Sequence, residues 1–319
     1  MKFKREYGPN LLVLVILIII SCYGCKNRAQ KQKKQIAIVV SSLNNPWFVF
    51  LAQSAADHAK LLGYECKVFD SQNNTSIEAD NFENAISSGY SAILLNPTDA
   101  DGSVANVLKA KNAGIPVFCM DREVNSTNDA TSQILSDSYS GCVDLGKYFV
   151  KSTHATGTYV ELLGIVADNN TWARSKGFHS VVDFYPGLKM VAQQTADFDR
   201  NKGLEVMESL LQAHPDINAV FCGNDAMAMG AYQAIVSAGK ANKIKVVGFD
   251  GSGDAIEAIK DGKVLATAMQ FPKIMAQTAV EYADKYFKGK RSFPKKIQIG
   301  VEMVSRENIG NYTAYGKKN

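Results

Sequence analysis

Polar and aromatic side chains recur directly after short apolar runs along this chain of 319 residues. Such runs are typical of buried β-strands, so these side chains are expected at strand ends. The set comprises Asn45, Trp47, Phe48, Asn96, Asp121, Arg122, the Asn170–Arg174 loop, Phe198, Asn224, Asp225, Asp250 and Gln270. Carboxylates, amides and guanidiniums form hydrogen bonds with hydroxyl groups, and aromatic rings cover the apolar C–H faces of a sugar ring. The set therefore predicts a binding site for a small polyhydroxylated ligand.

The elements that must position these side chains alternate between strands and helices. IAIVV at 36–40 is continuously apolar, and Asn45-Pro46 then offers an N-cap and a first-turn proline for a helix that stops at Gly63. The cycle repeats, and a second series starts near Gly141. This alternation predicts an α/β fold with two doubly wound parallel-sheet lobes. Because open α/β sheets bind ligands at the carboxyl ends of their strands, the side chains should line a cleft between the lobes.

Several members of the set also have an ordinary structural interpretation. Asp250 suits a turn or a helix N-cap, Phe48 suits a core position, and Asn96-Pro97 suits a turn. Their joint placement after successive strands favours the ligand site over these alternatives.

The first 34 residues differ from the rest of the chain. Three basic residues precede an apolar run at 11–20 that is too short to cross a bilayer as a helix, so a signal peptide is predicted over residues 1–21. The segment Ile19-Ile20-Ser21-Cys22 resembles a bacterial lipobox. Cys22 is therefore the predicted acylated residue of an exported protein, with Cys25 or cleavage without a lipid as alternatives. Residues 22–34 are polar and basic and are predicted to form a membrane-anchored tether.

The composition disfavours several other classes of function. The net charge of +4 owes much to the basic N-terminus, and no basic stripe with interleaved aromatics predicts a nucleic-acid partner. The remaining cysteines, Cys66, Cys119, Cys142 and Cys222, lie in no CxxC motif, so we predict no metal site and no cofactor, and their spacing assigns no disulfide. An EF-hand-like segment at 197–208 has its glycine at the seventh position instead of the sixth, which favours an ordinary helix start over a calcium site.

Long motifs follow one another in a family-specific order. They are SSLNNPWFVF, FDSQNN, ILLNPTD, MDRE, ADFDRNKGLEVM, HPDINAVFCGNDAMAMGA, VVGFDG and ATAMQ. Over nearly all of residues 35–304 the chain resembles the ribose-type periplasmic sugar-binding proteins. The resemblance implies a type I periplasmic-binding fold with a three-segment hinge near Ser136-Asp137, Gln270-Phe271 and Gln298. The implied N-terminal lobe is 35–136 plus 271–298, and the C-terminal lobe is 137–270 plus 299–319.

The resemblance also implies which residues contact the ligand. In the N-terminal lobe they are Asn45, Trp47, Phe48, Asn96, Asp121 and Arg122; in the C-terminal lobe they are Phe198, Asn224 and Asp250, with Gln270 at the hinge. The chain departs from the family at Trp172, where the ribose proteins have the first arginine of an Arg-x-Arg pair, and only Arg174 is kept. Exchanging a forked cation for an indole removes donors and adds bulk. The predicted ligand is therefore a pentose other than D-ribose, a sugar alcohol or a deoxy sugar.

The function implied by the resemblance is that of a monomeric substrate-binding component of an ABC sugar importer. Its partners would be a monosaccharide or sugar alcohol and a membrane permease, with a chemoreceptor as a further candidate. Two alternative functions have less support. Sugar-responsive repressors share the fold but begin with a helix-turn-helix, where this chain has a predicted signal peptide. A glycoside-processing enzyme could use Asp121 and Asp250 as paired carboxylates, but no Ser-His-Asp set, metal set or GxSxG motif accompanies them. We therefore predict a binding protein and not an enzyme.

Overall fold

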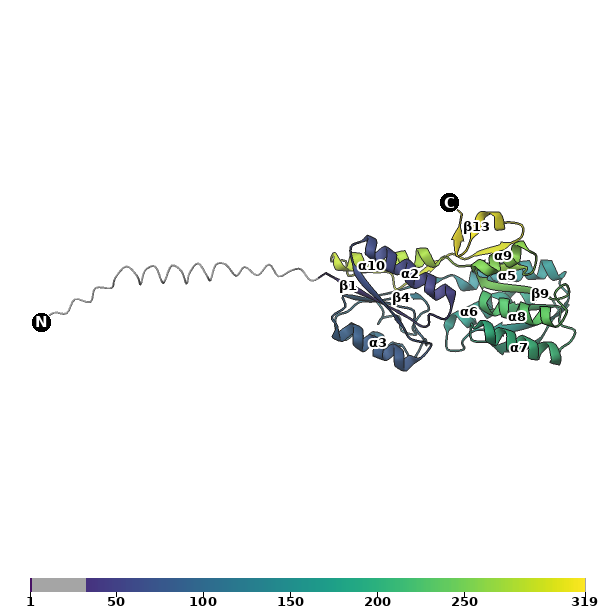
Figure 1. Ribbon diagram of the computed structural model, residues 1–319, viewed down its shortest axis with the longest axis horizontal. Helices are drawn as coiled ribbons and strands as arrows, with labels where there is room; N and C mark the ends of the chain where they lie inside the picture. Colours follow the sequence, from purple (N-terminus) through teal and green to yellow (C-terminus); the bar gives the residue numbers. More distant parts are fainter. Residues whose placement is uncertain (2–32, 319) are drawn as a thin grey trace. The chain divides into compact units, whose positions relative to one another are not determined.

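The computed structural model describes Met1 and residues 33–318, so the predicted signal peptide, Cys22 and Cys25 lie outside the described residues. From Gln35 onward the chain forms two six-stranded sheets with helices on both faces of each (Figure 1). The predicted α/β fold with two doubly wound lobes is confirmed. Among the described helices, none combines the length and apolar character that crossing a membrane requires.

The first sheet has the strand order β11-β5-β4-β3-β1-β2, and all of its strand pairs are parallel. Its strands are β1 (Gln35–Val40), β2 (Glu65–Asp70), β3 (Ala92–Leu95), β4 (Val117–Asp121), β5 (Ser132–Ser136) and β11 (Lys296–Ile299). Ile36 and Ile38 pack against α2 (Pro46–Leu61) and α10 (Pro272–Phe287), whereas Ala37 and Val39 face α3 (Thr75–Ser87) and α4 (Val104–Asn112). Because β1 is buried on both faces, it must be apolar throughout.

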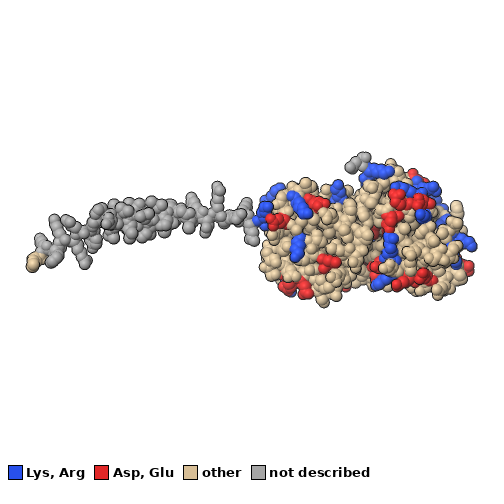
Figure 2. Space-filling view, viewed as in Figure 1, with Lys and Arg blue, Asp and Glu red and all other residues tan. Residues whose placement is uncertain are grey.

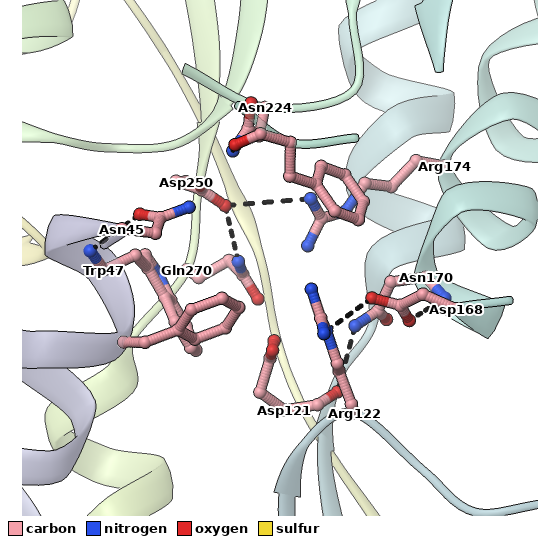
Figure 3. Close-up of a pocket in the computed structure, with 12 residues that line it drawn as sticks. Asn45, Trp47, Asp121, Arg122, Asp168, Asn170, Arg174, Asn224, Asp250 and Gln270 are labelled. Carbon is pink, nitrogen blue, oxygen red and sulfur yellow. Dashed lines mark hydrogen bonds and ion pairs between the residues drawn. The ribbon is translucent and has the colours of Figure 1, made fainter. Parts of the chain in front are cut away.

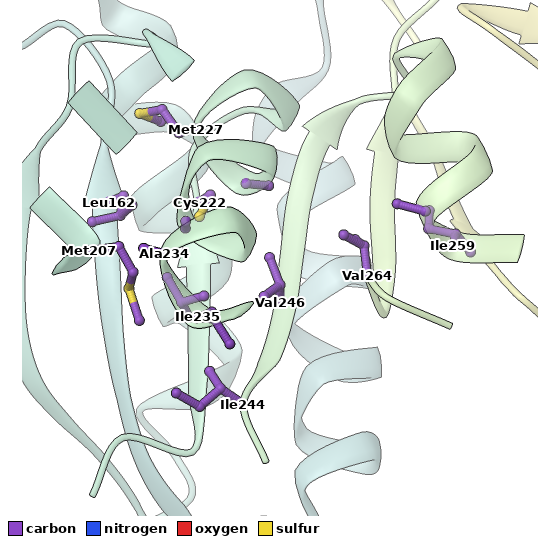
Figure 4. Close-up of a cluster of buried hydrophobic side chains, with 14 of the residues drawn as sticks. Leu162, Met207, Cys222, Met227, Ala234, Ile235, Ile244, Val246, Ile259 and Val264 are labelled. Atoms are coloured by element: carbon purple, nitrogen blue, oxygen red, sulfur yellow. The ribbon is translucent and has the colours of Figure 1, made fainter. Parts of the chain in front are cut away.

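The second sheet has the strand order β12-β10-β9-β8-β6-β7. Its strands are β6 (Gly157–Leu163), β7 (Leu188–Thr195), β8 (Ala219–Cys222), β9 (Lys245–Asp250), β10 (Ala266–Met269) and β12 (Glu302–Ser305). Helices α7 (Arg200–Ala213), α8 (Asp225–Ser237) and α9 (Gly253–Lys260) pack on one face around a core that includes Cys222, Met207 and Ile235 (Figure 4). Helices α5 (Ser138–Thr153) and α6 (Asn169–Val182) cover the other face.

The chain passes between the two sheets three times. It crosses after β5, after β10 and after β11, at Asp137, Gln270–Phe271 and Gly300–Val301. The third crossing joins strand to strand without an intervening helix, so β12 continues in the direction of β11 and pairs antiparallel with β10. The strand–helix alternation predicts only parallel sheets, so the antiparallel β12 departs from that prediction. The third hinge segment, expected near Gln298, lies just beyond this residue, which is inside β11.

The C-terminal segment contacts elements of both sheets. It comprises η1 (Ile309–Asn311), β13 (Tyr312–Thr313) and β14 (Gly316–Lys317). Tyr312 packs in the core around α7 and α8, whereas Tyr315 belongs to the core of the first sheet and lies against the ring of Phe50 at 5.1 Å. The Tyr315 nitrogen also donates to the Gly251 carbonyl oxygen at 2.8 Å. The implied assignment of all of 299–319 to the C-terminal lobe is therefore too simple.

Charged residues of both signs are interspersed over the face shown in Figure 2.

One ionic cluster is partly buried under α6. Nε2 of His179 lies 3.0 Å from Oε2 of the buried Glu161 on β6, and Nδ1 lies 2.8 Å from Oδ1 of Asp183. Gln193 Nε2 also donates to Glu161 at 2.6 Å. The hydrogen bond to Glu161 raises the pKa of His179 to about 9, with burial opposing the shift and Asp183 adding to it.

This cluster should make stability fall at alkaline pH. A folded pKa above the ordinary histidine value of about 6.5 contributes stability that is complete below pH 6.5 and lost as pH rises through 9. We expect the free energy of unfolding to fall by about 2 kcal/mol more in the wild type than in His179→Gln between pH 6.5 and 9.5. Urea titrations at both pH values measure the difference, and parallel losses in the two proteins would contradict the assignment.

Candidate functional site

Helix N-caps hold three polar side chains at one edge of the sheets. Asn45 caps α2 by accepting from the Trp47 nitrogen at 2.9 Å, and Asn224 caps α8 by accepting from the Met227 nitrogen at 2.9 Å. Asp168 caps α6 by accepting from the Asn170 nitrogen at 2.9 Å. Since each cap immediately precedes its helix, the strand–turn–helix connections fix all three groups toward the carboxyl ends of the strands.

Unusual backbone angles position three further side chains. Asp121 at the end of β4 has a φ of 66°, Phe198 after β7 has 59°, and Asp250 at the end of β9 has 123°. L-residues rarely adopt positive φ, and such strain concentrates at functional sites. The positive φ angles turn the carboxylate of Asp121 out of the first sheet and that of Asp250 out of the second, where β4 and β9 end.

These residues converge on one small cavity between the two sheets (Figure 3). In Figure 3 the side chains of Asp121, Arg122, Arg174, Asp250 and Gln270 point toward one another. The full lining is Asn45, Trp47, Phe48, Asp121, Arg122, Asp168, Asn170, Arg174, Phe198, Asn224, Asp250 and Gln270.

Ten of the twelve residues expected to contact the ligand line the cavity, and the exceptions are Asn96 and Trp172. Asp225, also in the initial set, does not line it either: it is fully buried and accepts from the Thr267 hydroxyl at 2.8 Å. Asn96 is fully buried behind the cavity and donates to Asp121 Oδ2 at 3.1 Å, so it orients the carboxylate from behind.

Trp172 is 37% exposed, and its Nε1 donates to the Val166 carbonyl oxygen at 2.9 Å. The expectation that its indole adds bulk to the site is wrong, because α6 directs Arg174 inward and leaves Trp172 outside.

Asp168 lines the cavity but was missed by sequence reasoning. Its only sequence signal is an acidic residue immediately before a helix, which is typical of an ordinary N-cap. Asn170 lay in the predicted loop but was not singled out. Its Nδ2 donates to the Asp121 carbonyl oxygen at 3.1 Å.

Two guanidiniums and three carboxylates set the electrostatics. Arg122 Nε lies 2.6 Å from Asp168 Oδ2, and Arg174 Nη1 lies 3.8 Å from Asp250 Oδ1. Burial raises the pKa of Asp121 to about 7, against the lowering effect of Arg174, and burial likewise raises the pKa of Asp250. In the described part of the chain, no group of three or more His, Cys, Asp or Glu side chains is arranged to hold a metal ion.

Several buried polar atoms at the cavity have no hydrogen-bond partner within the described chain. Apart from Arg122 Nε and Asp168 Oδ2, which form an ion pair with each other, they are Trp47 Nε1, Asp121 Oδ1, Arg174 Nε and Gln270 Oε1. A buried polar group left unpaired costs about 1–3 kcal/mol, so native proteins keep few of them. Here two acceptors and two donors border one small cavity, together with the rings of Phe48 and Phe198. A ligand rich in hydroxyl groups, which both donate and accept, would satisfy them.

Known proteins with similar sequences are import binding proteins. The chain is 42% identical over 276 residues to a D-apiose import binding protein of Paraburkholderia graminis, covering 86% of this chain and 88% of the relative. It is also 42% identical over 299 residues to the ribose import binding protein of Escherichia coli, covering 93% and 99%. The prediction of a binding protein instead of an enzyme is confirmed by this relationship.

Solved structures show the same fold. An ABC transporter periplasmic solute binding protein from Actinobacillus succinogenes with bound D-allose matches with a TM-score of 0.83 at 30% identity, covering 88% of this chain and all of that one. A model of the periplasmic binding protein domain matches residues 36–291. The chain is therefore a member of the periplasmic binding protein family.

Proposed function

We propose that this protein is the sugar-binding component of an ABC-type importer and holds one neutral monosaccharide or sugar alcohol in the cavity. The observation that carries the proposal is the set of unpaired buried donors and acceptors around a small space flanked by aromatic rings. Relatives named as apiose and ribose import binding proteins support the same class of ligand.

We infer that the ligand is bound by closure of the two lobes, because the site lies between them. The cavity takes Asn45, Asp121 and Arg122 from the N-terminal lobe, and Arg174, Phe198 and Asp250 from the C-terminal lobe. We place the lobe boundaries at the three crossings, with Ile299 in the N-terminal lobe. A ligand bonded to both sides favours the closed form, and a membrane permease would recognise that form from outside the cleft.

The proposed ligand is a pentose-sized monosaccharide or sugar alcohol. The expectation that D-ribose is disfavoured loses its basis, because Trp172 lies outside the cavity and the exchange at that position removes no donor from it. Arg174, which lines the cavity, is retained.

Membership of the periplasmic binding protein family implies export to the periplasm. The N-terminal sequence adds a proposal for how the protein is exported and anchored. We propose a signal peptide over 1–21 and lipid attachment at Cys22, with 22–34 as the tether. We further propose that the protein is a monomer and that it binds a membrane permease. A chemoreceptor is a further candidate partner.

A ligand screen tests the proposed function. Thermal-shift measurements against D-apiose, D-ribose, D-allose, L-arabinose, myo-inositol and ribitol, followed by calorimetry, should find one neutral polyol that binds at micromolar or lower concentration. At 1,000 times Kd, such a ligand stabilises the folded state by about 4 kcal/mol. Absence of any carbohydrate ligand would contradict the function.

A further inference from the structure

The connection between β6 and α6 belongs to the second lobe but forms hydrogen bonds with loops of the first lobe. The Ala100 nitrogen donates to the Ala167 carbonyl oxygen at 3.1 Å. Asn169 Nδ2 lies 2.8 Å from Glu123 Oε1 and 2.8 Å from Asn125 Oδ1. The segment around Asp168 is therefore seated on both lobes by contacts of its own.

Asp168 is held rigidly within this segment. It is 4% exposed, and Oδ1 is used to cap α6. The N-terminus of a helix stabilises a carboxylate through the aligned peptide dipoles. Oδ2 is left free of that role and lies against Nε of Arg122, which is 3% exposed. Neither of these two atoms forms a hydrogen bond elsewhere in the described part of the chain, so the ion pair is their interaction.

The ion pairs between the arginines and the carboxylates of the cavity determine the net charge around a bound ligand. Arg122 faces Asp168, and Arg174 faces Asp250, so each cation of the cavity already has a carboxylate of the protein beside it. Asp121 adds a further acidic group with one unpaired oxygen. A ligand carboxylate would enter a site with no uncompensated guanidinium and would lie close to buried acids. Like charges brought together in a desolvated site are strongly unfavourable.

We propose that Asp168 is a specificity-determining residue: by compensating Arg122 from the opposite lobe, it makes the cavity accept a neutral sugar and reject the corresponding sugar acid. This inference rests on the proposed sugar-binding function. It assigns Asp168 a role beyond capping α6, since a cap alone would be served equally by asparagine.

The substitution Asp168→Asn separates these roles, because asparagine keeps the side-chain size and the cap and removes the charge. Calorimetry with D-ribose and D-apiose as neutral probes, and with D-ribonate and D-glucuronate as anionic probes, gives the ratio of anion to neutral affinity. We expect this ratio to rise at least tenfold in Asp168→Asn, with D-ribonate binding weakened by added salt. Adding Arg122→Gln to that variant should abolish the gain.

A matched control removes a charge nearby but outside the cavity. Glu123 contacts Asn169 across the lobes and pairs with Lys296. In Glu123→Gln the ratio should stay within twofold of the wild type. An unchanged ratio in Asp168→Asn, loss of all binding by that variant while its melting temperature is retained, or an equal rise in Glu123→Gln would each overturn the inference. A wild-type protein that binds no carbohydrate would instead overturn the proposed function.

Discussion

Replacing Arg174 with methionine should weaken binding of the cognate sugar by at least about 100-fold, or roughly 2.7 kcal/mol. Arg174 is 4% exposed, and its Nη1 donates to the Gly223 carbonyl oxygen at 2.8 Å. Its Nε has no hydrogen-bond partner in the described chain and borders the cavity. A hydrogen bond to a charged group contributes about 1.5–3 kcal/mol, and the change also leaves Asp250 buried without its cation. Calorimetry at 20 °C measures the affinity.

The matched control lies two residues away on the same helix. Trp172→Ala removes a larger side chain that bonds to Val166 outside the cavity, so affinity should stay within threefold of the wild type. Circular dichroism at the same temperature separates lost binding from lost folding. A loss in Trp172→Ala as large as that in Arg174→Met would mean that the indole, and not the guanidinium, serves the ligand.

Most of the cavity could be predicted from the sequence because the end of each strand is marked by a local sequence pattern. An apolar run followed by a helix start fixes where each strand ends, and parallel sheets bring those ends to one edge. Asn45, Asp121, Phe198 and Asp250 were placed together on this argument and line one cavity. The same argument also selected Asn96, but a strand end does not say whether a side chain reaches the cavity or supports a neighbour from behind.

The remaining errors arose where position depends on contacts between distant segments. Which of Trp172 and Arg174 faces inward is set by the rotation of α6, and its first turn is fixed by the cap at Asp168 and by bonds to the other lobe. The antiparallel β12 and the divided packing of Tyr312 and Tyr315 follow from the third crossing. No local pattern encodes such long-range pairings, so propensity and periodicity could not predict them.

Two glycines allow α7 and α8 to approach closely beside the site. A Cβ added to Gly203 would lie 2.8 Å from the Met227 Cα, closer than real side chains come. A Cβ added to Gly230 would clash with the Arg200 carbonyl oxygen and lie 2.9 Å from the Leu204 nitrogen. Backbone atoms of a neighbouring helix cannot rotate aside as a flexible side chain can. The separation of the two helices is therefore fixed by these glycines.

Gly230→Ala should lower the free energy of unfolding by about 3 kcal/mol, near the upper end for overpacked cores, and the melting temperature by roughly 6–12 °C. Sugar affinity should fall about tenfold as well, because Asn224 at the start of α8 donates to the Phe198 carbonyl oxygen just before α7, and separating the helices stretches this 3.3 Å bond. Differential scanning calorimetry and ligand titration measure both effects.

Gly310→Ala is the matched control, since a Cβ there meets nothing within 4 Å, and it should change stability by less than about 0.5 kcal/mol. If Gly230→Ala changed stability and sugar affinity as little as Gly310→Ala, the close approach of α7 and α8 would not determine the position of Phe198 at the cavity.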